Sequence, residues 1–266
     1  HTGHNHSCHH PNTHKISELE IARNPSAIHN TLFKKQRRKE MMSGARPSEC
    51  DYCWGVEDNS DLYSDRVFKS SEDWSWPLRD QIIGSNWRDD FNPRYVEVNF
   101  NQACNFKCMY CSPHLSTTWE DEINKSGPYQ IKDSNGKLEF HNHIEYLTRD
   151  GLMPLKVKQD DNPYLEAFWQ WWPELYPNLR HFRMTGGEPT MDKNTYRVFD
   201  YVLANPKSDL HLNVTSNFSQ EAAVFDKYMS YVKQLCEGEK IEHFMQFVSI
   251  DTWGKQAEYL RHGMDF

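Results

Sequence analysis

The three cysteines Cys104, Cys108 and Cys111 limit the fold of this chain more than any other feature. Three thiolates on one short loop can hold three corners of a cubane iron–sulfur cluster, which leaves one iron without a protein ligand. An open coordination position is typical of a catalytic metal site, whereas a closed one is usually structural. The spacing taken alone is also compatible with zinc. The fold must therefore present three thiols together on one loop.

Strands and helices alternate around and after this loop. We predict strands at 95–100, 180–184, 210–215 and 244–250, with helices at 191–204 and 220–236. Strands that alternate with helices indicate parallel βα units. Four such units do not close a barrel, so we expect an α/β fold with a partial (β/α) TIM-like barrel and with further C-terminal sequence missing.

Glycines and polar residues gather where these strands end. Gly186, Gly187 and Glu188 follow the second strand, and the glycines allow a ligand to approach the backbone. Exposed carbonyls and a carboxylate suit a bound ammonium group. The third strand ends at Ser216 and Asn217, and the fourth region carries Ser249, Asp251 and Arg261. Because Ser249 and Asp251 are two residues apart, we expect them on one face of a strand. In a parallel barrel such strand ends share one face.

The chain resembles the radical S-adenosylmethionine (SAM) enzymes. Cys104-x3-Cys108-x2-Cys111, with Tyr110 before the last cysteine, matches the cluster loop of that superfamily, and the segment 186–189 matches its second hallmark. The resemblance covers residues 93–266. It implies that reductive cleavage of SAM at a [4Fe–4S] cluster yields a 5′-deoxyadenosyl radical, which abstracts a substrate hydrogen. A reductant protein such as flavodoxin or ferredoxin would supply the electron.

The resemblance also implies roles for individual residues. Cys104, Cys108 and Cys111 would bind three irons, and SAM would chelate the fourth. The SAM ammonium would meet Gly186, Gly187 and Glu188, and its carboxylate or ribose would meet Ser216 and Asn217. Ribose contacts are implied for Ser249 and Asp251, a carboxylate contact for Arg261, and proximity to the adenine for the Tyr110 backbone.

A second group of cysteines lies in residues 1–58. Cys50-x2-Cys53, with Cys8 upstream, resembles the end of a SPASM or twitch auxiliary-cluster module, in a phage- and marine-bacterium-like subgroup whose module precedes the barrel. The resemblance implies a second iron–sulfur cluster. A zinc knuckle remains the alternative, because zinc readily takes three Cys and one His, here His9, His10 or His14. Residues 59–92 are interpreted as a linker or wrapping segment.

Several further elements are expected from local patterns. Pro25 and Ser26 indicate a helix start, and Gly44 its end. Cys236 lies alone on a helical stretch, which favours a buried structural thiol. His114 follows the cluster loop, where loop packing is favoured over catalysis. An apolar stripe at helical spacing predicts core packing on the sheet; its members are Leu165, Phe168, Trp169, Trp172 and Leu175.

Charge and composition narrow the classes of function. The net charge of −8 and the lack of a basic, aromatic-lined groove pattern argue against nucleic acid as a partner. No apolar run approaches the roughly 18 residues that span a membrane. Grouped cysteines in odd number favour metal ligation in a reducing, cytoplasmic compartment. Peptide or protein modification is the first hypothesis for the reaction; a carbohydrate or nucleotide-derived substrate, or a non-catalytic metal-binding interaction module, are the alternatives.

Overall fold

The computed structural model describes residues 1–8, 10–139 and 142–266, and these form two compact units. The first, called here the sheet unit, comprises residues 1–2, 96–159 and 180–266. The second, the helical unit, comprises residues 3–95 and 160–179. The segment 59–92, expected as a linker, lies in the helical unit, where it carries two short helices.

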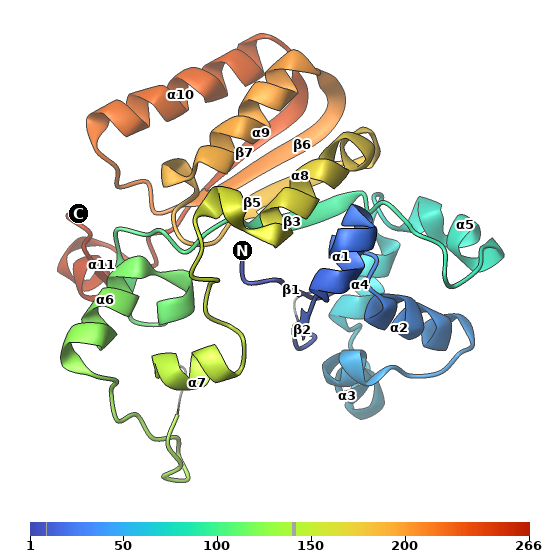
Figure 1. Cartoon of the computed structure of the whole chain (residues 1–266), viewed down its shortest axis with the longest axis horizontal. Coiled ribbons are helices and arrows are strands. Elements are labelled where there is room, and N and C mark those ends of the chain that lie inside the picture. Colours follow the sequence, from blue (N-terminus) through green and yellow to red (C-terminus); the bar gives the residue numbers. More distant parts are fainter. Residues whose placement is uncertain (9, 140–141) are drawn as a thin grey trace. The chain divides into compact units, whose positions relative to one another are not determined.

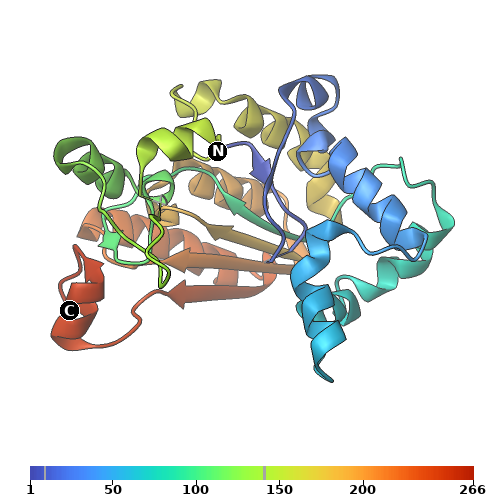
Figure 2. The same ribbon diagram turned by 90° about the horizontal axis from the view of Figure 1, so that it is seen from below.

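A four-stranded sheet organises the sheet unit. Its strands are β3 (Tyr95–Asn99), β5 (His181–Thr185), β6 (Lys207–Ser216) and β7 (Ile241–Val248), in that order. β5, β6 and β7 are paired in parallel, and their arrows point the same way in Figure 2. All four predicted strands are therefore confirmed. The parallel sheet is compatible with the predicted partial (β/α) fold, and it is open, not closed into a barrel.

Two helices cover one face of this sheet. α9 (Lys193–Ala204) and α10 (Ala222–Glu237) lie side by side next to β6 and β7 in Figure 1. Successive side chains of a strand point to opposite faces, so Leu210, Leu212 and Val214 of β6 are all buried on the helical side. Both predicted helices are thus confirmed.

The prediction for Cys236 is wrong, because this residue is exposed on α10. The buried face of the helix is carried by Tyr228 and Leu235. One further residue turns the side chain by about 100°, which places Cys236 outside that face.

Shorter elements complete the sheet unit. They are β4 (Lys107–Cys108), α6 (Thr117–Ser126), α7 (Ile144–Arg149), α11 (Gly254–Leu260) and β8 (Arg261–His262). β4 and β8 form an antiparallel pair of their own. This small pair holds the cysteine loop, as described below.

The helical unit contains six α-helices among its described residues and one short strand pair. The strands are β1 (His4–Asn5) and β2 (His14–Lys15). The helices are α1 (Glu18–Arg23), α2 (Leu32–Met42), α3 (Asp51–Asn59), α4 (Asp65–Ser71), α5 (Arg79–Gly84) and α8 (Pro163–Leu175).

The single helix expected from Pro25 to Gly44 is divided in two. A 3₁₀ turn (Pro25–Ile28) precedes α2. Asn24 accepts a hydrogen bond from the Ser26 amide, and Thr31 accepts one from the Lys34 amide. A second N-cap inside the run starts a new helix, so the chain turns at 29–31.

The apolar stripe of α8 is buried as predicted, except for the half-buried Trp169. Within the helical unit α8 packs on α1 and on the 3₁₀ turn at 25–28. Helical spacing shows which face of a helix is buried, but it carries no information about the partner.

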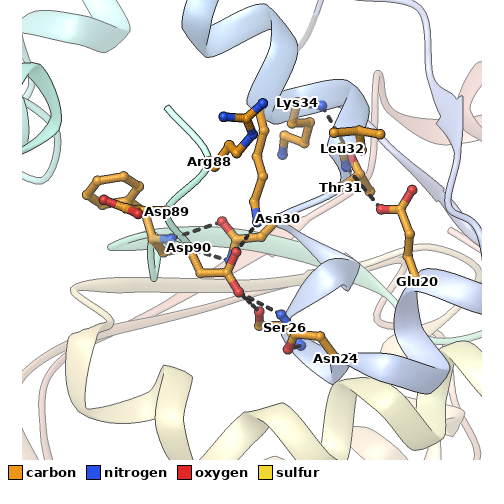
Figure 3. A network of polar contacts seen from close by, with 12 residues as sticks. Glu20, Asn24, Ser26, Asn30, Thr31, Leu32, Lys34, Arg88, Asp89 and Asp90 are labelled. Atoms are coloured by element: carbon orange, nitrogen blue, oxygen red, sulfur yellow. Dashed lines mark hydrogen bonds and ion pairs between the residues drawn. The ribbon is translucent and has the colours of Figure 1, made fainter. Parts of the chain in front are cut away.

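Polar contacts tie the segment 24–30, which precedes α2, to the segment 88–91 (Figure 3). Asp90 accepts hydrogen bonds from the Asn24 amide group at 2.6 Å and the Ser26 hydroxyl at 2.8 Å. Asn30 pairs with the backbone of Phe91 through both its amide nitrogen and its oxygen, at 3.1 and 3.0 Å.

Among the described helices, none has both the length and the apolarity that a membrane crossing requires.

We predict that acid destabilises the protein partly through His14. Its Nε2 lies 2.9 Å from the Thr31 hydroxyl, and burial, aided by the charge of Lys34, lowers the pKa of His14 to about 4. The unfolded chain, with a pKa near 6.5, binds the proton first, so this contribution to stability is complete above pH 6.5 and is lost as the pH falls towards 4. Urea midpoints of the metal-free chain between pH 4 and 7 measure it. His14→Gln should flatten this slope, and an unchanged slope would refute the assignment.

Candidate metal centre

The start of α6 holds the cysteine loop in shape. The Ser116 and Thr118 hydroxyls donate to the Phe106 carbonyl at 2.7 and 2.6 Å, and the Thr117 hydroxyl donates to the Cys104 carbonyl at 3.2 Å. Three consecutive hydroxyl residues therefore pin the loop to a helix terminus. The sequence analysis missed them, although Ser116, which caps this helix, is a typical N-cap residue.

The C-terminal segment holds the other side of the loop. β4 and β8 pair Lys107 with His262 and Cys108 with Arg261, and the Met109 amide donates to the Leu260 carbonyl at 2.9 Å. Residues more than 150 positions apart thus share one small ladder. Side-chain hydroxyls on one side and backbone hydrogen bonds on the other therefore fix the loop.

The three thiols form a set of donors that fits an iron–sulfur cluster. Burial raises the pKa of all three, that of Cys104 to about 11, and a charged Cys108 would raise the pKa of both Cys104 and Cys111 further. The Phe106 amide and the Arg261 guanidinium point at the sulfurs of Cys104 and Cys108, at 3.5 and 3.4 Å. Cationic groups and N–H donors beside the sulfurs stabilise thiolates and shift the reduction potential of a cluster.

A metal ion bound by one site needs at least three ligands close together. Among the described residues, no three His, Cys, Asp or Glu side chains lie close enough to hold a single ion. The cysteines of a cubane each bind a different iron, so they need not converge in this way. His114, next to the loop, hydrogen-bonds to the Ser112 hydroxyl at 2.7 Å, which agrees with the expected packing role.

The glycines after β5 allow the backbone to lie against the loop. Gly186 has φ +115°, and a Cβ there would come within 2.1 Å of the Asn99 side-chain oxygen. A Cβ on Gly187 would come within 2.3 Å of the Ala103 carbonyl. Only glycine fits at such a distance. The Glu188 amide donates to the same carbonyl at 2.6 Å, which joins this segment to the cysteine loop.

Glu188 lies at the centre of a buried network, with 1% of its surface exposed. Its carboxylate accepts hydrogen bonds from the Ser216 hydroxyl, the Asn217 amide and both the amide and hydroxyl of Thr190, at 2.6–3.1 Å. Glu188 therefore joins the ends of β5 and β6. The Asn217 side chain continues the network to Asn105 at 2.7 Å and lies 4.0 Å from the Cys104 sulfur.

Replacing Glu188 with Gln should destabilise the protein by about 1–3 kcal/mol. The substitution turns one acceptor into a donor that faces protein donors, and a buried polar group without a partner costs about this much. Urea denaturation measures the change, and Glu237→Gln, on an exposed part of α10, is the control. Equal stability of both variants would show that the carboxylate network contributes little.

Asp251 and Arg261 meet beside the loop. The guanidinium binds the Asp251 carboxylate at 2.7 and 3.0 Å, and the Tyr110 hydroxyl donates to the same carboxylate at 2.7 Å.

The expectation that Ser249 and Asp251 share a strand face is wrong. β7 ends at Val248, and Asp251 has φ +66° in the following turn. The Ser249 amide instead donates to the Ser216 carbonyl at 2.9 Å, which keeps it at the strand ends.

The structure brings all the predicted residues of the sheet unit to one region. The cysteine loop, the segment 186–188, Ser216, Asn217, Asp251 and Arg261 are connected by the contacts above. In the helical unit, Cys8, Cys50 and Cys53 line one pocket. Burial raises the pKa of Cys8 and Cys50, and a charged Cys53 would raise both further. Of the alternative ligands, His10 and His14 are described: His10 lines the same pocket and binds Asp65 at 2.6 Å, and His14 binds Thr31. His9 lies outside the described residues.

The chain is distantly similar to curated enzymes called GTP 3′,8-cyclase. It is 26% identical over 125 residues to that of Campylobacter lari, 25% over 123 residues to that of Nautilia profundicola, and 23% over 123 residues to that of Campylobacter jejuni. Each alignment covers 46–47% of this chain, and 27% of the relative. The chain thus matches about a quarter of the length of these relatives. No family model and no solved structure matches it.

Proposed function

We propose that this chain is a radical SAM enzyme in which Cys104, Cys108 and Cys111 hold a [4Fe–4S] cluster. The observation that carries the proposal is the packing of the segment 186–188 against a loop with three thiols. The distant similarity to the GTP 3′,8-cyclases supports the superfamily. A cluster with bound SAM supplies one-electron cleavage of SAM and, from it, a carbon radical that abstracts hydrogen.

The residues of the chain position these groups. Gly186 and Gly187 let this backbone lie against Asn99 and the cysteine loop, where its carbonyls are proposed to meet the SAM ammonium, and Glu188 holds that backbone in place through its network. Ser216 and Asn217 lie at the neighbouring strand end, where they can meet the carboxylate or ribose. Ser249 lies there too, and Asp251 is proposed as a ribose contact. Arg261 places a cation beside the cluster loop and braces Asp251.

A nucleotide-derived small molecule is our proposed substrate. The relatives are named for a reaction of GTP, whereas no finding supports modification of a peptide or protein. A reductant protein such as flavodoxin or ferredoxin would deliver the electron. Cys8, Cys50 and Cys53 are the proposed ligands of a second cluster, with a zinc knuckle as the alternative for this pocket.

Iron and sulfide content after anaerobic reconstitution, with EPR of the reduced protein, tests the proposal. About four irons and a signal that SAM perturbs are expected for the first cluster, and about eight if the second forms. A folded protein whose signal does not respond to SAM would contradict the enzyme assignment. It would favour the metal-binding module instead. Zinc bound in place of iron at Cys8, Cys50 and Cys53 would identify the knuckle.

A further inference from the structure

The pocket that Cys8, Cys50 and Cys53 line is a cavity of about 340 Å³ within the helical unit, and cationic side chains line it as well. The cations are Lys34, Arg37, Arg38, Arg66 and Lys69, and Glu49 is the one carboxylate among the described lining residues. The chain as a whole has a net charge of −8. Positive charge concentrated in one hollow of an acidic protein focuses an attractive field for anions. The volume suits a small molecule.

Some of these cations already have partners. Arg66 is held by Glu57 at 2.6 and 3.2 Å, and Arg38 donates to the Asp89 carbonyl at 2.7 Å. These contacts fix both guanidinium groups in place. The charge of Arg66 lowers the pKa of Cys50, although burial raises that pKa by more. The Arg66 guanidinium therefore acts electrostatically on groups in the cavity.

Other cations keep donors for a ligand. Arg37 pairs with Glu40 through one nitrogen, but its Nε is enclosed and has no hydrogen-bond partner among the described residues. Lys69 forms no ion pair within the described ranges. Lys34 is 8% exposed, and its ammonium contacts the neutral groups of Asn5 and His29 at 3.5 and 3.2 Å.

Within the described ranges, the Lys34 ammonium forms no ion pair with a carboxylate, and Glu49 acts on it only at longer range. Burial lowers the pKa of Lys34 to about 8, and of the nearby charges Glu49 opposes this shift while Arg38 adds to it. An isolated buried ammonium is unfavourable, and a bound anion would offset that cost.

The wall that carries these cations is held in position before any ligand binds. Lys34, Arg37 and Arg38 all lie on α2, whose start is fixed by Thr31, and the Glu20 carboxylate accepts from the Leu32 amide at 3.0 Å. Figure 3 shows how Asn30 and Asp90 join this region to the segment 88–91. A preorganised site loses less entropy on binding.

We propose that this cavity binds a small oxyanion ligand, a compound bearing a phosphate or carboxylate group, between α2 and Lys69. Planar guanidinium groups match the paired oxygens of either group. The proposal is independent of the radical SAM function, since it requires neither SAM nor the cluster at Cys104, Cys108 and Cys111.

Calorimetric titration of the 266-residue chain with pyrophosphate and with citrate tests it. We expect saturable binding that weakens with added salt, and at least a tenfold loss of affinity in the double variant Arg37→Gln/Lys69→Gln. Lys39→Gln is the control, because this exposed lysine is on the same helix outside the cavity. Tighter pyrophosphate binding would identify a phosphate ligand, and tighter citrate binding a carboxylate. Lys69→Gln alone, checked by its urea midpoint, replaces the double variant if that does not fold.

Two results would overturn the proposal. One is the absence of binding, or equal binding by the cavity variants and the control. The other is binding to the iron-free chain that disappears after iron is loaded, because the cations would then serve a cluster held by Cys8, Cys50 and Cys53. Binding that persists in both forms supports an independent anion site.

Discussion

Cys108→Ala is expected to lower the iron content by about four per chain and to reduce SAM cleavage to background. Cys108 is buried in β4, and a cubane that has lost one of three thiolates is held by only two residues of one loop. Iron and sulfide analysis after reconstitution, together with the yield of 5′-deoxyadenosine, measures both effects.

Cys236→Ser is the matched control for this variant. Cys236 is an exposed cysteine on α10, away from the loop, so its loss should change neither quantity. If Cys108→Ala kept its iron and its SAM cleavage while folding normally, the assignment of the cluster to this loop would be wrong.

The largest electrostatic effect is expected at Arg261. This guanidinium is buried and lies 3.4 Å from the Cys108 sulfur. A nearby cation stabilises the more negative, reduced cluster, so Arg261→Gln should lower the reduction potential by on the order of 50 mV. Breaking the pair with Asp251 should also cost about 1 kcal/mol of stability, because the Asp251 carboxylate is exposed and the pair is not fully buried.

Asp251→Asn provides the opposite test. It removes a negative charge and leaves Arg261 uncompensated, so the potential should rise. EPR-monitored redox titration without SAM measures both variants. Shifts of the same sign, or none, would mean that Arg261 acts on the structure of the loop and not through its charge.

The sequence predicted the local elements of the fold well. The four strands and the helices α9 and α10 follow from alternation and helical periodicity, which are local properties. The cysteine loop and the glycine segment were also identifiable, because their chemistry requires those residues at that spacing. The neighbours of Glu188 were not, since its contacts with Ser216 and Asn217 join residues that are distant in sequence.

The errors share a physical cause. Burial of Cys236 depends on which face of α10 meets the sheet. The turn at Asp251 depends on its bond with Arg261 and on where β7 stops pairing with β6. None of these is encoded in a short window of residues. The basic cavity could not be predicted from a short window either. Its cations come from α2 and from residues 66–69, which are separate in sequence.

The pairing of β4 with β8 also orders events during synthesis of the chain. When the cysteines leave the ribosome, the strand that flanks Cys108 has no partner until residues 261 and 262 have been made. Contacts across such a sequence separation form late in folding. The loop is therefore completed only after Arg261 and His262 have been made, so stable insertion of the proposed cluster would follow synthesis of this segment. A chain that stalls before Arg261 would offer its thiols to iron and oxidants without this protection.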